Sequence, residues 1–375
     1  MKKRLLFFVH YLELGGAEMS LIGLLESLDY SKYEVDLFVY AHRGGLMKAI
    51  PPQVHLLPEV PEYAQIERPI KDVLKDGYWR IAAARLLAKY EYARYVRRKH
   101  PHDGSAIFSF VARRVAPLMP VLDRNYDIAV SYLAPHDYVL GRVKAGKKLC
   151  WIHTDYSQID VNRKLELPVW NGYDTIIALS ESVRDSFAEV FPELKSKLQV
   201  HRNLIPKSYI SNKSKQIPAD VVSREMPYRQ GEIKLLSVGR FCAAKNYDNV
   251  PDICRRINEK LAPSGLKAVW YLIGFGGDEA LIRSKIQSEC SPGQVVILGK
   301  KDNPYPYMLA CDYYVQPSRY EGDPVTVHEA AALGKPFVIT AFPTAADVVS
   351  SEPLGTIVPL ENEACACGLA EILLK

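Results

Sequence analysis

Short hydrophobic runs alternate with helix-length segments along the whole chain. In the first half, runs suited to β-strands lie at 5–12, 33–40, 126–133, 148–154 and 174–180. In the second half they lie at 233–239, 268–274, 294–299, 312–318 and 336–340. Helices are expected between most of them, for example at 16–29 and 249–262. This alternation predicts an α/β protein in which helices cover parallel sheets.

A polar segment interrupts this pattern near the middle. From Asn203 to Glu232 the hydrophobic runs lapse, and the segment carries three prolines. We therefore expect an N-terminal Rossmann-like domain over 1–203, a linker over 204–232 and a C-terminal Rossmann-like domain over 233–375. A chain of 375 residues is long enough for two such domains. Their parallel sheets are expected to face each other across a cleft, with ligand-binding residues directly after strands.

Composition narrows the class of protein. A hydrophobic content of 48% and a charged content of 24% are typical of a folded protein. The net charge of +5 favours anionic ligands but is too small to indicate a nucleic-acid-binding protein. The seven scattered cysteines include no Cys-x-x-Cys, which favours reduced thiols in a cytoplasm. The apolar run from Leu5 to Tyr11 is interpreted as a buried strand, and no run reaches the ~18 residues of a membrane span.

The stretch "YEGDPVTVHEAAALGKP" places Glu321 and Glu329 eight positions apart. The strand 313–316 precedes it, Pro324 suits the first turn of a helix, and Gly334 suits its end. Glu321 would then lie in the loop and Glu329 in the helix, on either side of a helix N-terminus that attracts anions. Each carboxylate can accept two hydroxyl protons, as on a sugar or a ribose. Two solvated surface glutamates are the alternative.

Two cations follow the strand that ends near Val238. Arg240 comes directly after Gly239, and Lys245 lies one loop further on. A planar guanidinium and a compact ammonium in this position suit a diphosphate, although surface residues would explain either one alone.

Two weaker signals lie in the first half. Gly15 and Gly16 follow the first strand, where paired glycines let the backbone approach a ligand, but the sequence is not the G-x-G-x-x-G of dinucleotide sites. His153 follows another strand and could donate a hydrogen bond to a substrate, or be structural. Motifs for bound metal ions and for serine nucleophiles are not found, so no metal is expected.

The segment 77–100 combines seven Lys and Arg residues with one acid, Glu91. A stripe at helical spacing comprises Trp79, Ala83, Leu86, Tyr90 and Ala93. A cationic helix of this kind can lie on an anionic membrane surface. A core-packing helix with a solvated basic face is an equally good interpretation.

Taken together, these motifs resemble glycosyltransferase family four, whose retaining enzymes have the GT-B fold. "EGDPVTVHE" resembles the Glu-x7-Glu signature of that family, and "SVGRFCAAKN" resembles its diphosphate loop. "GGAE", "WIHTDY" and "ILGKKDNPYPYMLACDYYVQPSRYEG" are also similar to members of the family. The resemblance covers nearly the whole chain and is most specific over 235–340.

The resemblance implies roles for individual residues. Arg240 and Lys245 would hold the diphosphate of a UDP- or GDP-sugar, aided by the backbone at Gly15 and Gly16. Glu321 would bind the hydroxyls of the donor sugar, Glu329 the ribose, and His153 would lie near the transferred sugar. The backbone of Asp323, Pro324, Val325 and Thr326 would contact the sugar and phosphate, and 299–301, including Lys301, would border the base. Glu13, Asp155 and Tyr156 are the candidates for acceptor contacts.

The function so implied is retaining, metal-independent transfer of a sugar to a glycan or lipid-linked saccharide in bacterial surface-polysaccharide synthesis. The enzyme would work in the cytoplasm, at the inner face of the membrane if 77–100 binds lipid. Asp323-Pro324 replaces the common Phe-Gly of the family, and the C-terminal brace of the family is expected to be shorter or absent. A sugar-nucleotide epimerase and a non-catalytic nucleotide-sugar-binding subunit are the alternatives.

Overall fold

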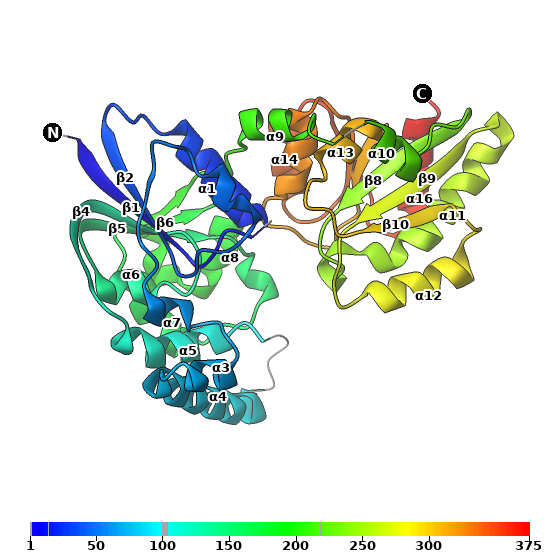
Figure 1. The fold of residues 1–375 in the computed structure, drawn as a ribbon. Helices are drawn as coiled ribbons and strands as arrows, with labels where there is room; N and C mark the ends of the chain where they lie inside the picture. The colour runs from blue at the N-terminus through cyan, green and yellow to red at the C-terminus, as the bar shows by residue number, and fades with distance from the viewer. Residues whose placement is uncertain (1, 14, 100–103, 218) are drawn as a thin grey trace. The chain divides into compact units, whose positions relative to one another are not determined.

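The computed structural model describes residues 2–13, 15–99, 104–217 and 219–375 (Figure 1). The chain divides into two compact units, residues 1–204 and 205–375. Each unit is an α/β layer structure built on its own parallel sheet. The expected α/β class with two Rossmann-like domains is confirmed.

The first unit contains, within the described residues, a seven-stranded parallel sheet in the order β3-β2-β1-β4-β5-β6-β7. Its strands are β1 Lys3–Val9, β2 Tyr33–Val39, β3 His55–Leu56, β4 Leu122–Ser131, β5 Val143–Ile152, β6 Thr175–Ala178 and β7 Leu198–Val200. Its α-helices are α1 Gly16–Ser27, α2 Pro61–Ala64, α3 Ile70–Lys75, α4 Trp79–Lys99, α5 Ile107–Val115, α6 Asp137–Arg142, α7 Arg163–Asn171 and α8 Glu181–Val190.

The second unit contains a six-stranded parallel sheet, again within the described residues, in the order β10-β9-β8-β11-β12-β13. Its strands are β8 Glu232–Val238, β9 Lys267–Ile273, β10 Val295–Gly299, β11 Tyr313–Gln316, β12 Phe337–Thr340 and β13 Gly355–Val358. Its α-helices are α9 Lys207–Lys213, α10 Ala219–Glu225, α11 Val250–Leu261, α12 Glu279–Glu289, α13 Tyr305–Ala310, α14 Val325–Ala332, α15 Ala345–Ser351 and α16 Asn362–Leu373.

The central strands become hydrophobic and buried toward their carboxyl ends, as at 129–130 of β4 and 235–236 of β8, because helices cover both faces of each sheet. In the second unit α11 packs against β9, α12 and α16, and these helices form one layer (Figure 1). On the other face α14 contacts β11 and β12, and α13 contacts β8. Trp270 of β9 is fully buried in the core that α11 and α16 complete. The second unit is therefore a three-layer sandwich, and the loops at the ends of its strands are available to bind ligands.

The strand order of the second unit reverses direction between β8 and β11. From β8 the chain adds β9 and β10 on one side, then returns to add β11, β12 and β13 on the other. At such a switch point the loops after the two central strands diverge and leave a crevice at their carboxyl ends. Ligands of open α/β sheets bind there, so the loops after β8 and β11 are the first place to search for a site.

The segment 204–232, expected as a linker, contains α9 and α10. These helices contact α13 and α14 of the second unit, and Ile210 and Val222 are buried. Residues 205–375 accordingly form one compact unit. The position of the domain boundary stays a prediction, but α9 and α10 are held in place by packing against α13 and α14.

Helix α4 exposes its hydrophobic stripe. Trp79 is 67% exposed, Leu86 52% and Tyr90 60%, while Ile81 and Ala88 on another face are buried. The stripe therefore does not pack in the core of this chain. No helix in the described ranges is both long and apolar enough to cross a membrane.

Candidate functional site

The loops that follow β8 and β11 bring the charged residues of two sequence motifs together. β8 and β11 are adjacent strands, and Leu235 and Leu236 pair with Tyr313 and Tyr314. The first loop leads through the 3₁₀ turn Ala243–Lys245, and the second through 317–324 into α14. Lys245 and Glu321, 76 residues apart in sequence, thereby meet at a distance of 2.5 Å between Nζ and Oε1.

Glu321 is held by three donors on one of its two oxygens. Oε1 accepts from Lys245 Nζ, from Ser318 Oγ at 2.5 Å and from Gln316 Nε2 at 2.9 Å. Among the described residues, no group donates to Oε2. Glu321 and Lys245 are both only slightly exposed. The carboxylate is therefore fixed in orientation, and one of its oxygens can accept hydrogen bonds from a ligand.

An ion pair ties the two loops to each other. The Arg319 guanidinium makes two parallel hydrogen bonds to the Asp248 carboxylate, each of 2.9 Å. The backbone N–H of Arg319 also donates to the carbonyl of Ala244 at 2.8 Å. Burial tends to raise the pKa of Asp248, but the hydrogen bonds and charge of Arg319 outweigh it and leave this pKa below its usual value. The two loops are thus connected independently of any ligand.

The loop after β9 packs closely against the loop after β8, and a glycine makes this contact possible. A Cβ on Gly274, directly after β9, would lie 1.9 Å from the carbonyl oxygen of Gly239. Phe241 and Phe275 further join these loops, since the N–H of Phe241 donates to the carbonyl of Phe275 at 2.8 Å. Gly274 is therefore required for the close approach of backbone to backbone beside the Lys245 loop.

Helix α14 places Glu329 in a buried position. Pro324 is its N-cap, and Gly334, with φ +72°, occupies the left-handed position that ends it. Glu329 is 4% exposed, and Tyr305 from α13 donates to its Oε1 at 3.0 Å. Burial raises the pKa of Glu329 to about 7, against the smaller lowering effects of Tyr305 and His328. Burial excludes the interpretation of Glu329 as a solvated surface glutamate.

The N-terminus of α14 carries the remaining residues of the motif. The first N–H groups of any helix, here those of Val325 and Thr326, have no carbonyl partner within the helix. Asp323, just before the N-cap, is largely buried, and its Oδ1 lies 2.6 Å from Nε2 of His328. The carboxylate of Asp323 is therefore held by a side chain of the same helix.

Arg240 and Lys301 differ in their surroundings. Arg240 is exposed and makes no hydrogen bond or ion pair with the described part of the chain. Lys301 donates to Glu225 of α10 at 2.8 Å, and its ammonium lies over the ring of Tyr307. Arg240 is thus free to bind an anion, whereas the ammonium of Lys301 already has a carboxylate partner.

The first unit carries the other residues expected to contact the donor. Gly15 is the N-cap of α1, and a Cβ there would meet the flexible end of the Glu18 side chain. His153 follows β5, and its Nε2 lies 2.8 Å from the carbonyl oxygen of Tyr132. A carbonyl only accepts hydrogen bonds, so Nε2 carries a proton. Nδ1 would then donate to a substrate only from the protonated ring. Gly16 is exposed in the first turn of α1, and its role in contacting the donor stays a prediction.

The three candidates for acceptor contacts lie in different environments. Glu13 is exposed. Asp155 is buried and caps the turn Tyr156–Gln158, since its Oδ1 accepts from the backbone N–H and the hydroxyl of Ser157. The ring of Tyr156 packs edge-on against Phe187 in the core of the unit. Asp155 and Tyr156 therefore have structural contacts of their own, and their acceptor roles stay predictions.

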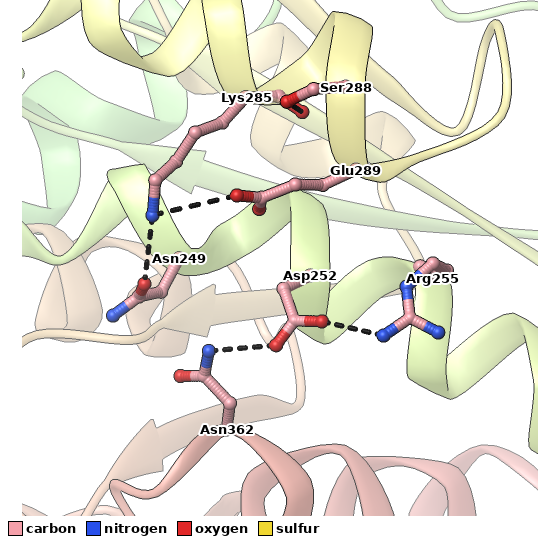
Figure 2. A pocket seen from close by; sticks show the side chains of 7 residues that line it. All are labelled: Asn249, Asp252, Arg255, Lys285, Ser288, Glu289 and Asn362. Atoms are coloured by element: carbon pink, nitrogen blue, oxygen red, sulfur yellow. Dashed lines mark hydrogen bonds and ion pairs between the residues drawn. The ribbon is translucent and has the colours of Figure 1, made fainter.

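A cavity of about 420 Å³ lies elsewhere in the second unit, where α11, α12 and α16 meet (Figure 2). Several of its charged groups pair with one another. Lys285 pairs with Glu289 and donates to Asn249, while Asp252 accepts from Arg255 and Asn362. These residues come from helices on one face rather than from strand ends. Since ligands of open α/β sheets bind at strand ends, we place the candidate site at β8 and β11.

Comparison with known proteins relates the second unit to glycosyltransferases. Residues 222–375 match the family model described as "Glycosyl transferases group 1", a range that includes both loops and α14. Comparison with curated proteins finds no match. The structure of Alr3699/HepE from Anabaena in complex with UDP and glucose is similar with a TM-score of 0.64 and 15% identity, over 100% of this chain and 90% of that one. The chain has the GT-B fold.

Other GT-B structures are similar to the same degree. An E. coli trehalose-6-phosphate structure bound with UDP-2-fluoro glucose has a TM-score of 0.65 at 14% identity, over 99% of this chain and 91% of that one. WaaG, a glycosyltransferase involved in lipopolysaccharide biosynthesis, has a TM-score of 0.57 at 15% identity, over 99% and 90%. At these identities the similarity concerns the fold, and the GT-B fold predicted from the sequence motifs is confirmed.

Several residues of the site are not evident from the sequence. Gln316 and Ser318 hold Glu321, and their alternate spacing at the end of β11 could have indicated that they point to one side. Thr344 donates to the backbone carbonyl of Glu321 at 3.0 Å, and Tyr305 donates to Glu329. These two partners lie on other elements and give no local signal.

Proposed function

We propose that this protein is a retaining glycosyltransferase that transfers a sugar from a UDP- or GDP-sugar to a glycan or lipid-linked saccharide. The observation that carries the proposal is the geometry of Glu321. Its Oε1 is fixed by Lys245, Ser318 and Gln316, while Oε2 is left for a ligand. It lies at the switch point of a unit that matches a glycosyltransferase family model. A carboxylate so oriented suits adjacent sugar hydroxyls.

The donor would be held by residues of the second unit. Lys245 and the unpaired Arg240 would bind the diphosphate, together with the N–H groups at the start of α14. Glu329, in the helix interior, would accept from the ribose hydroxyls. Similar GT-B structures contain UDP, with glucose in one of them, which supports a nucleotide sugar as donor. Lys301, bound by Glu225, would border the base through its backbone.

Catalysis would depend on positioning and on charge stabilisation. As the bond between the sugar and the diphosphate breaks, negative charge grows on the leaving phosphate. Lys245 and Arg240 would stabilise that charge, and the acceptor hydroxyl would attack from the same face, so no protein nucleophile is needed. Glu321 would orient the sugar during this step. We assign no metal ion to the site.

The cellular context belongs to the same proposal. The mild positive charge and the seven free thiols suit a cytoplasmic enzyme. The similarity to WaaG supports a role in bacterial surface-polysaccharide synthesis. The acceptor would be bound by the first unit, for which Glu13 is the exposed candidate.

Binding of nucleoside diphosphates tests the donor site. We expect UDP or GDP, with its sugar conjugates, to raise the melting temperature of the protein selectively among UDP, GDP, ADP, CMP and NAD. A ligand at ~100 times its dissociation constant adds about 2.7 kcal/mol of stability, which a thermal shift readily detects. The shift should disappear in Arg240→Ala. A shift that is unchanged in this variant would contradict the assignment of Arg240.

Product analysis then separates three activities. A glycosyltransferase lengthens an acceptor and releases the nucleoside diphosphate. An epimerase returns an inverted sugar nucleotide, and a binding subunit turns nothing over. Retention of the anomeric configuration, measured by NMR of the product, would support the retaining mechanism, and inversion would refute it.

We further propose that α4 places the enzyme on an anionic membrane surface. On a helical projection the exposed Trp79, Leu86 and Tyr90 share one face, and Arg94 and Arg97 lie within or beside it. Glu91, the single acid of 77–100, is bound by Arg114 of α5. An exposed apolar stripe with cations within and beside it suits the interface of a bilayer with anionic lipids.

Charge reversal tests this surface. Replacing Arg94, Arg97 and Arg98 with glutamate should weaken binding to phosphatidylglycerol-containing liposomes at least about tenfold, because each cation near such a surface contributes about 1 kcal/mol. Sedimentation at low and high salt measures the effect. A matched variant with Arg255, Arg256 and Arg283 replaced changes the same net charge on another surface. If both triple variants bind equally, α4 is not the contact.

A further inference from the structure

His328 lies between two carboxylates from different elements. Its Nε2 is 2.6 Å from Oδ1 of Asp323, in the loop before α14, and its Nδ1 is 3.0 Å from Oε1 of Glu352, directly after α15. All three side chains are buried or partly buried. Ionised carboxylates only accept hydrogen bonds, so both ring nitrogens must carry protons to satisfy this arrangement. The contacts therefore describe an imidazolium.

The electrostatics agree with this geometry. Burial tends to lower the pKa of His328, but its hydrogen bonds and ion pairs with Asp323 and Glu352 outweigh burial and raise the pKa. Glu329, the next residue in the helix, is the other titratable group near the ring. The charges facing His328 are therefore the carboxylates of Asp323, Glu352 and Glu329.

Without a positively charged partner, the carboxylate of Asp323 would weaken the binding of an anionic donor at the proposed site. It immediately precedes Pro324, the N-cap of α14, so its carboxylate lies at the end of the helix that attracts anions. A fixed negative charge there competes with a bound diphosphate and repels it. The hydrogen bond to His328 directs Oδ1 along the helix and sets a positive charge beside it.

We propose that His328 is a positioning residue of the donor site, whose imidazolium holds the Asp323 carboxylate and offsets its charge so that the N-terminus of α14 can accept an anionic donor. The inference rests on the proposed function. It differs from a purely structural role, in which His328 would only tie α14 to the segment after α15. The two roles differ in whether the effect of His328 depends on the charge of Asp323.

A double-mutant cycle distinguishes these roles. Wild type, His328→Gln, Asp323→Asn and the double variant are titrated with UDP, or with GDP if wild type prefers it, by calorimetry, and each is checked by circular dichroism melting. His328→Gln should weaken binding about tenfold. In the Asp323→Asn background the same exchange should change the dissociation constant less than about twofold. Equal weakening in both backgrounds would overturn the inference and leave the proposed function intact.

The pH dependence gives a second measurement that does not require the His328 variant to fold. In wild type, binding should weaken as the pH rises through the raised pKa of His328 and the imidazolium is lost. In Asp323→Asn the part of the pH dependence that comes from His328 should be absent. Glu329 titrates in both proteins, so its contribution cancels when the two pH profiles are compared. Identical profiles would refute the role of His328. If wild type bound no nucleoside diphosphate at any pH, the proposed function itself would fail, and the inference with it.

Discussion

Lys245→Met is expected to lower kcat/KM for sugar transfer by about 10²–10³, with the fold intact. Lys245 is the cation that the loop after β8 brings to Glu321, and its Nζ lies 2.5 Å from Oε1. If it stabilises the charge that grows on the leaving phosphate, its loss raises the barrier to the chemical step more than it weakens ground-state binding. We therefore expect kcat to fall more than the affinity for UDP.

The measurement is steady-state kinetics together with UDP titration of the same variant. Ser318 and Gln316 still bind Glu321 when Lys245 is replaced, so the loop should keep its structure. Lys285→Met is the matched control, because Lys285 is also partly buried in the second unit but lies in the cavity of Figure 2. The control should retain activity within about twofold. A Lys245→Met variant with near wild-type kcat would refute the proposed role.

Glu329→Gln is expected to abolish most activity and at the same time stabilise the free protein at alkaline pH. Burial raises the pKa of Glu329 from 4.5 to about 7. Between these values the folded protein binds more protons than the unfolded chain, so stability falls as the pH rises from about 4.5 to about 7. Above that window the ionised carboxylate costs about 3 kcal/mol, since one pKa unit corresponds to 1.36 kcal/mol. Glutamine is neutral at every pH, so its burial does not destabilise the folded protein as the pH rises.

Chemical denaturation at pH 5 and pH 8 tests the stability effect. The variant should be more stable than wild type at pH 8 and nearly equal at pH 5, whereas its transfer activity should fall about 100-fold because an ionised acceptor for the ribose is lost. Glu371→Gln, at an exposed position on α16, serves as the control and should change stability by less than about 0.5 kcal/mol. Full activity in Glu329→Gln would remove Glu329 from the donor site.

The sequence predicted the segment around the site closely because its signals are local. The strand 313–316, the loop with Glu321 and the helix end before Gly334 follow from residue types within a few positions, whereas Pro324, expected in the first turn, is the N-cap. The cationic helix 77–100 was predicted for the same reason, and α4 spans Trp79–Lys99. The sequence did not predict whether the hydrophobic stripe of α4 is buried or exposed. Such a stripe can pack in a core or lie on a membrane, and the neighbouring elements decide between the two.

The features that were not predicted depend on distant contacts. α9 and α10 each bury few residues, so the segment 204–232 shows no hydrophobic period even though packing on α13 and α14 orders it. Tyr305 reaches Glu329 across 24 positions, and Arg319 reaches Asp248 across 71. Such pairs are fixed by the strand order of the sheet, which no local pattern specifies.

Under the proposed function, the link between Arg319 and Asp248 has a consequence for how the second unit would use binding energy. Two loops that would otherwise fluctuate separately are joined before any nucleotide arrives. The entropy of ordering them is lost once, on folding, and does not recur in each catalytic cycle. In the proposed enzyme, free energy from binding the base and ribose would therefore be retained for the reacting end of the donor. In this respect the second unit resembles a preorganised receptor more than one that closes by induced fit.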